Sequence, residues 1–154
     1  MHSSPIIQLD NVRLSYPSPT AQPVEALRGI TLSIAQGEYV CILGSNGSGK
    51  SSLIQLLNAL ILPTSGDVRV LGKSTLDPAN AMAIRTRAAM VFQHPEDQMT
   101  TSIVADDVAF GPENLGVPRE QIVQRVDAAL AAVGMGHLAQ ADPADLSGGQ
   151  KPVS

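Results

Sequence analysis

The chain has 154 residues, about the length of one domain, and 44% of them are hydrophobic, with two Tyr, two Phe and no Trp, so its core must be mainly aliphatic. A net charge of −4 and a pI near 5.2, without a basic stripe, argue against a general nucleic-acid-binding surface. The sequence has neither a signal peptide pattern nor a run of about 18 apolar residues, so we expect a cytosolic chain without a membrane span.

The N-terminal part has the pattern of antiparallel strands. Apolar residues predict strands over Ile6–Leu9 and Val12–Tyr16, and residues 30–34 alternate between apolar and polar. A stretch rich in Pro and Ser, from Pro17 to Pro23, forms a linker between them.

The apolar residues Tyr39–Leu43 predict a further strand. Cys41, the only cysteine, lies within it, which favours a small buried hydrophobic residue over a redox or metal-binding group. One cysteine also excludes a disulfide within the chain.

A phosphate-binding loop follows this predicted strand. Residues 44–51 read Gly-Ser-Asn-Gly-Ser-Gly-Lys-Ser and match the pattern Gly-x4-Gly-Lys-Ser, and a helix pattern over Ser52–Leu62 comes directly after them. Glycines allow successive backbone N–H groups to converge on phosphate oxygens at the positive end of a helix. The alternative is an ordinary Gly/Ser turn, which leaves the order of strand, loop, Lys-Ser and helix as coincidence.

Two side chains at the end of this loop fit phosphate chemistry. Lys50 can meet the β- and γ-phosphates as a mobile positive charge, and Ser51 can offer its hydroxyl to Mg²⁺. Because Mg²⁺ keeps several waters and binds mainly through phosphates, we expect it to arrive with the nucleotide.

The rest of the chain alternates strand and helix patterns, which is typical of an α/β fold. Pro63 should end the first helix, Asp67–Leu71 should return as a strand, and Met90–Phe92 is a short apolar run before Gln93. Pro118 should open a second helix that ends before a glycine. The apolar face of that helix comprises Ile122, Val126, Ala129, Leu130 and Val133.

Four features in this order resemble the ATP-binding cassette (ABC) ATPases: Tyr16, the loop at 44–51, Phe92–Gln93, and the pentapeptide Leu-Ser-Gly-Gly-Gln at 146–150. Residues 92–98 and 106–116 are similar to the ATPase subunits of energy-coupling factor (ECF) transporters. The resemblance implies a P-loop NTPase of the ABC type, with an N-terminal antiparallel β subdomain, a partial RecA-like core and a helical subdomain. It covers residues 6–150, as an incomplete ATP-binding domain.

The resemblance also implies roles for single residues, with ATP and Mg²⁺ as cofactors. Tyr16 would stack on the adenine, although a half-buried strand tyrosine is the alternative. Lys50 and Gln93 would be catalytic, and Ser51 and Gln93 would contact Mg²⁺. The residues implied to bind the nucleotide are Tyr16, Gly44, Ser45, Asn46, Gly47, Ser48, Gly49, Lys50, Ser51, Ser52, Gln93, Ser147, Gly148, Gly149 and Gln150.

The His, Glu and Asp residues around the Gln93 segment do not have the spacing of a metal site. We interpret this region as solvated and facing a partner instead. The residues concerned are His94, Glu96, Asp97, Asp106 and Asp107.

The pentapeptide also makes local physical sense, because Ser147 and Gln150 form a capping box that opens a helix and leaves N–H groups free for an anion. In the family it faces the γ-phosphate held by a second ABC ATPase subunit, so the resemblance implies a homo- or heterodimer. It also implies a transmembrane transporter partner, a peripheral position on the cytoplasmic face of the plasma membrane, uptake of a vitamin or metal ion, and no nucleic-acid partner.

The last residues depart from the family pattern. Pro152 would fall in the second turn of the helix opened at Ser147, where it cannot continue the hydrogen-bond ladder. The family's Walker B aspartate, catalytic glutamate and switch histidine, expected further on, do not occur. We therefore expect a fragment with an aberrant tail at 151–154, nearly lost hydrolysis and poor solubility.

Four hypotheses remain open. The chain is an incomplete copy of a transport ATPase subunit, or a non-hydrolytic nucleotide-binding module that pairs with a complete cassette, or a decayed product without function. A P-loop kinase or GTPase is a further alternative, but it leaves the pentapeptide unexplained.

Overall fold

The computed structural model describes residues 5–20, 22–93 and 98–146. The chain divides into two compact units, Met1–Met90 and Val91–Ser154. Each unit has its own hydrophobic core.

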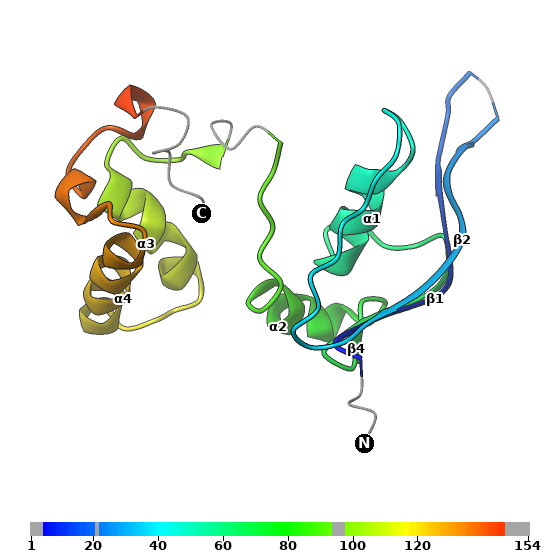
Figure 1. Cartoon of the computed structure of the whole chain (residues 1–154), viewed down its shortest axis with the longest axis horizontal. Helices are drawn as coiled ribbons and strands as arrows, with labels where there is room; N and C mark the ends of the chain where they lie inside the picture. Colours follow the sequence, from blue (N-terminus) through cyan, green and yellow to red (C-terminus); the bar gives the residue numbers. More distant parts are fainter. Residues whose placement is uncertain (1–4, 21, 94–97, 147–154) are drawn as a thin grey trace. The chain divides into compact units, whose positions relative to one another are not determined.

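The first unit contains an antiparallel sheet of four strands in the order β2-β1-β3-β4. The long β1–β2 hairpin, blue in Figure 1, aligns Ile7 with Ile34 and Tyr16 with Val24. This confirms the antiparallel opening predicted from the sequence. The strands are β1 (Ile7–Tyr16), β2 (Val24–Ile34), β3 (Ser65–Val70) and β4 (Lys73–Ser74).

A bulge interrupts β1 where the sequence pattern indicated two separate strands. The register shifts after Leu9, and Asn11 has a positive φ of 46°. The Asn11 amide donates to Thr31 Oγ1 on β2 at 3.0 Å, so the bulge is held by a side chain as well as by the ladder. The polar Asp10–Asn11 pair therefore lies inside one continuous strand.

Helix α1 (Lys50–Leu57) follows the phosphate-binding loop and packs on the sheet. Its buried side chains, Leu53 and Leu56, join a core that the sheet and α2 (Ala81–Arg85) complete. A 3₁₀ turn, η1 (Pro78–Asn80), precedes α2. The buried core residues are Leu9, Val12, Leu14, Leu27, Leu53, Leu56, Ala59, Val68, Val70 and Ile84.

Helix α1 is shorter than the predicted range Ser52–Leu62. It ends at Leu57, and Ala59 adopts a left-handed φ of 56°. The Ala59 amide donates to the Leu56 carbonyl and the Leu60 amide donates back to the Gln55 carbonyl, which is the hydrogen-bond pattern of a Schellman ending. The local backbone, not Pro63, therefore ends the helix.

One predicted strand is wrong among the described residues. Tyr39–Leu43 forms no strand, with Tyr39 98% and Leu43 87% exposed, and Cys41 is exposed rather than buried. The short apolar run Met90–Phe92, for which no strand was predicted, is not part of the sheet either. The physical reason is that a strand requires a neighbour for its N–H and C=O groups, and the sheet described here pairs only β1 to β4 with one another.

The second unit is helical. Its core comes from α3 (Val104–Asn114), α4 (Arg119–Ala132) and two 3₁₀ turns, η3 (Gly136–Leu138) and η4 (Pro143–Asp145). Helix α4 begins after Pro118 as predicted and buries Ile122, Val126 and Leu130. The other two residues of the predicted face, Ala129 and Val133, are exposed, because the buried stripe is only one residue wide per turn.

Helix α3 was not predicted, and it corrects our interpretation of one acidic residue. Asp106 is exposed, but Asp107 is buried with 3% of its surface accessible. Its Oδ1 accepts hydrogen bonds from the Thr100 amide at 2.9 Å and from Thr100 Oγ1 at 3.2 Å. Asp107 is therefore a structural anchor rather than a solvated residue facing a partner.

The first turn of α3 also binds the segment before the pentapeptide. The Val104 amide donates to the Ala141 carbonyl at 3.0 Å, and the Ala105 amide donates to the Ala139 carbonyl at 2.9 Å. These bonds satisfy helix N–H groups that have no partner within the helix itself. In the part of the chain described here, no helix is long and apolar enough to span a membrane.

Close backbone packing at Gly66 gives a first prediction. A Cβ there would lie 2.5 Å from the carbonyl oxygens of Asp10 and Asn11, whereas a Cβ at Gly72 would meet nothing within 4 Å, and both glycines have a positive φ. Gly66→Ala should lower the free energy of unfolding by about 3 kcal/mol or more, because strain in φ and steric overlap add. Gly72→Ala should cost only the strain, about 1–2 kcal/mol. Urea unfolding of both variants measures the difference, and equal losses would contradict the described packing.

The buried carboxylate gives a second prediction. Asp107→Ala removes the acceptor for two hydrogen bonds and should lower the free energy of unfolding by about 1–3 kcal/mol. Asp106→Ala, the exposed neighbour, should change it by less than about 0.5 kcal/mol. Thermal or urea unfolding of the two variants tests this contrast; a larger loss for Asp106→Ala would disprove the anchoring role of Asp107.

Candidate functional site

The phosphate-binding loop ends at a glycine that the fold requires. Gly49 is the residue before α1 and has a φ of 89°. A Cβ at Gly49 would lie 2.6 Å from the Ala26 carbonyl oxygen and 2.9 Å from Leu27 Cδ2, both on β2. Only glycine therefore lets the loop pass this close to the sheet and turn into α1.

Lys50 folds back over the loop. Its Nζ donates to the carbonyl oxygens of Gly44 at 2.9 Å and Ser45 at 2.8 Å, and it lies 3.4 Å from Ser48 Oγ. These contacts hold the ammonium group among the loop residues, where the first-turn N–H groups of α1 also lie. The loop thus combines a fixed cation with the positive end of a helix. The first turn of α1 contains no acidic residue that would oppose an anion there.

The two serines after Lys50 lie in the first turn of α1. Ser51 is exposed, so its hydroxyl is accessible to a ligand, while Ser52 is half-buried. An exposed hydroxyl beside Lys50 fits a Mg²⁺ ion that binds mainly through phosphate oxygens. Within the described residues no group of three or more His, Cys, Asp or Glu side chains could hold a metal ion.

Tyr16 lies beside this first turn although it is far away in sequence. It is the last residue of β1, its side chain is 39% exposed, and its hydroxyl lies 3.0 Å from Ser52 Oγ. The structure therefore brings together Tyr16 and the loop, two of the four features on which the family resemblance depends.

The remaining predicted residues belong to the second unit. Gln93 is exposed and lies in a bend. Ser147, Gly148, Gly149 and Gln150, like His94, Glu96 and Asp97, lie outside the described residues.

The contribution of β2 to the loop was not predicted from the sequence. Glu25, Ala26, Leu27 and Arg28 line a hollow of about 340 Å³ together with Gly47 and Ser48. Arg28 and Arg13 both pair with Glu25, at 3.4 Å and 3.0 Å. The hollow joins residues of β2 and of the loop that lie about 20 positions apart, and the sequence offers no signal for it beyond the alternation of β2.

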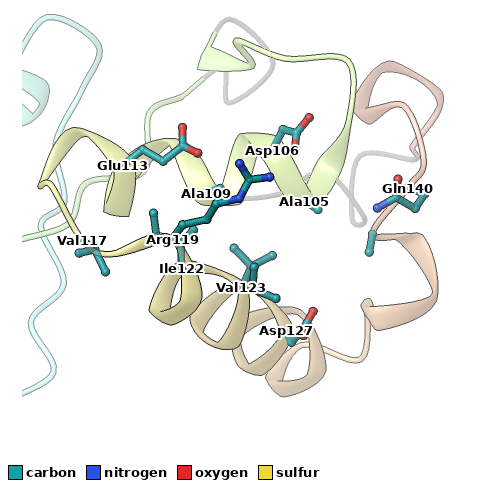
Figure 2. A pocket seen from close by; sticks show the side chains of 12 residues that line it. Ala105, Asp106, Ala109, Glu113, Val117, Arg119, Ile122, Val123, Asp127 and Gln140 are labelled. Atoms are coloured by element: carbon teal, nitrogen blue, oxygen red, sulfur yellow. The ribbon is translucent and has the colours of Figure 1, made fainter.

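A larger cavity lies in the second unit, between α3 and α4. It measures about 530 Å³, and its floor is apolar, with Ile122 and Val126 among the lining residues. Figure 2 shows the Arg119 side chain extending across it toward Asp106, with Glu113 and Asp127 also at its border. None of the predicted site residues lines it, so size alone does not identify the nucleotide site.

Comparisons with known proteins support the family resemblance that the loop carries. A family model described as ABC transporter matches residues 27–153. The energy-coupling factor transporter ATP-binding protein EcfA1 of Enterococcus faecalis is 50% identical over 147 residues, which are 96% of this chain and 52% of that protein. The protein of the same name from Symbiobacterium thermophilum is 47% identical over 153 residues, covering 97% of this chain and 53% of that protein. The chain thus spans about half the length of these curated relatives.

Solved structures support the same fold. Chain cbiO1 from Clostridium perfringens, described as part of the ABC transporter complex cbiONQ, has a TM-score of 0.80 and 34% identity over 97% of this chain and 58% of its own. The ATP-binding cassette MJ0796, in a dimeric structure bound to ADP and phosphate, has a TM-score of 0.79 and 28% identity over 94% of this chain and 65% of its own. With a family match over most of its length, a P-loop fold and a loop built for phosphate, the chain belongs to the ABC transporter family.

Proposed function

We propose that this chain, over residues 6–150, forms part of the ATP-binding subunit of an ECF-type ABC importer, which couples ATP binding and hydrolysis to uptake of a vitamin or metal ion. The observation that carries the proposal is the arrangement of Lys50 over the loop at the start of α1. A cation held among backbone groups at a helix N-terminus suits the β- and γ-phosphates of ATP.

The adenine end of the nucleotide would lie at Tyr16, whose partly exposed ring is beside the first turn of α1. The residues that would hold the phosphates run from Gly44 to Ser52. The exposed Ser51 hydroxyl and Gln93 would hold Mg²⁺, which would supply positive charge to neutralise the phosphates. Gln93 would also help to position the attacking water.

The site would be completed by a second cassette. Residues Ser147–Gln150 would face the γ-phosphate held by the partner's loop, and a transmembrane component would bind both cassettes at the cytoplasmic face of the membrane. This is supported by the dimeric state of the MJ0796 cassette and by the membership of cbiO1 in a transporter complex. The membrane component would select the solute.

Removing the loop cation should abolish tight nucleotide binding. Lys50→Ala loses charge-assisted hydrogen bonds to the phosphates, each contributing about 1.5–3 kcal/mol, so the Kd for Mg-ATP should rise at least about tenfold. Isothermal titration calorimetry measures the change. The matched control is Lys73→Ala on β4, an exposed lysine outside the loop, which should bind Mg-ATP like the unmodified chain. Unchanged binding by Lys50→Ala would refute the proposed site.

A protein made of these 154 residues should bind ATP but turn it over at close to the uncatalysed rate. In phosphoryl transfer, catalysis depends on the groups that hold Mg²⁺ and orient water, and the acids that the family places after the pentapeptide are not among these residues. Phosphate release, measured with a coupled assay, should not exceed that of Lys50→Ala. Turnover near 1 s⁻¹ that Lys50→Ala removes would contradict this expectation.

A further inference from the structure

The contact between Tyr16 and Ser52 joins two parts of the proposed nucleotide site. Their hydroxyl oxygens lie 3.0 Å apart, within hydrogen-bond distance, although the residues are 36 positions apart in the chain. Tyr16 ends β1, and Ser52 lies in the first turn of α1 directly after Lys50 and Ser51. The other tyrosine, Tyr39, is 98% exposed.

Both ends of this hydrogen bond are held by the fold. Tyr16 pairs with Val24 in the hairpin, and the preceding residue, Ser15, donates its amide to Thr64 Oγ1 at 2.9 Å. On the other side, Leu53 and Leu56 fix α1 in the core. Because both backbones are fixed, little conformational entropy is lost when the two hydroxyls meet.

The bond can persist when phosphate binds. A serine hydroxyl has one proton and two lone pairs, and either oxygen of this pair can be the donor. With an anion at the start of α1, Ser52 can give its proton to the anion while Tyr16 donates to the Ser52 oxygen. Phosphate binding and the Tyr16 contact are therefore compatible.

We propose that Tyr16 is a positioning residue whose hydroxyl, through Ser52, holds the aromatic ring at a fixed place relative to the phosphate-binding loop. This inference rests on the proposed function, and it adds that the tyrosine hydroxyl, not only the ring, contributes to recognition of the base. A ring held in place loses less rotational freedom when the base stacks on it. The hydroxyl should therefore matter for ligands with a base and not for phosphate chains alone.

The test compares Tyr16→Phe with the unmodified chain, using Mg-ATP and inorganic tripolyphosphate in calorimetric titrations. Tyr16→Phe keeps the ring and removes the hydroxyl, so the Kd for Mg-ATP should rise about 3- to 10-fold, the range expected for one hydrogen bond. The Kd for tripolyphosphate should change less than about twofold. Tyr39→Phe, the matched control, should leave both unchanged.

A double-mutant cycle with Ser52→Ala assigns the effect to this pair. In the Ser52→Ala background, Tyr16→Phe should cause no further loss of ATP affinity, because the partner is already absent. The inference is overturned if Tyr16→Phe binds ATP as the unmodified chain does, if tripolyphosphate loses equally, or if the two losses simply add.

The two proposals fail in different ways. If the unmodified chain binds neither Mg-ATP nor tripolyphosphate, the proposed function is wrong and the role of Tyr16 falls with it. If the unmodified chain binds both ligands and Tyr16→Phe does not discriminate between them, only the positioning role is wrong.

Discussion

The candidate site depends on one close contact, the approach of Gly49 to β2. Because Gly49 has no side chain and a left-handed φ of 89°, the loop can pass the Ala26 carbonyl and turn directly into α1. Any Cβ at this position would push the start of α1 away from the sheet. The position of the loop is therefore set by backbone packing, and Lys50, Ser51 and Ser52 are placed by that packing in turn.

The β1–β2 hairpin supports this site from both of its strands. On β2, Ala26 and Leu27 lie under Gly49, and on β1 the hydroxyl of Tyr16 reaches Ser52. Helix α1 thus contacts both strands within its first turn. An antiparallel hairpin is a rigid support for such contacts, since its register fixes where each side chain projects. The aromatic ring and the phosphate-binding loop, distant in sequence, become neighbours through this register.

Local patterns predicted the parts of the structure that local interactions determine. The phosphate-binding loop, the hairpin strands and the start of α4 after Pro118 follow from glycine spacing, alternation and helix signals. The strand predicted over Tyr39–Leu43 was wrong because strand formation depends on a pairing partner, which apolar composition does not reveal. The interpretation of Asp107 as a solvated residue was wrong for a similar reason. An acidic residue in a charged run is ordinarily solvated, and only the fold brings Thr100 to it. The contact between Tyr16 and Ser52 likewise had no signature in the sequence.

In the second unit, α3 joins two segments that are about 40 positions apart in the chain. Thr100, on the C-terminal side of Gln93, is tied to Asp107, while Ala139 and Ala141, on the N-terminal side of the pentapeptide, accept the first amides of α3. Both segments are therefore fixed to the same end of one helix. Because α3 is a rigid element with buried Val104 at this end, a displacement of either segment must move the helix or break these hydrogen bonds. The segment at Thr100 and the segment at Ala139–Ala141 are therefore connected to each other through α3.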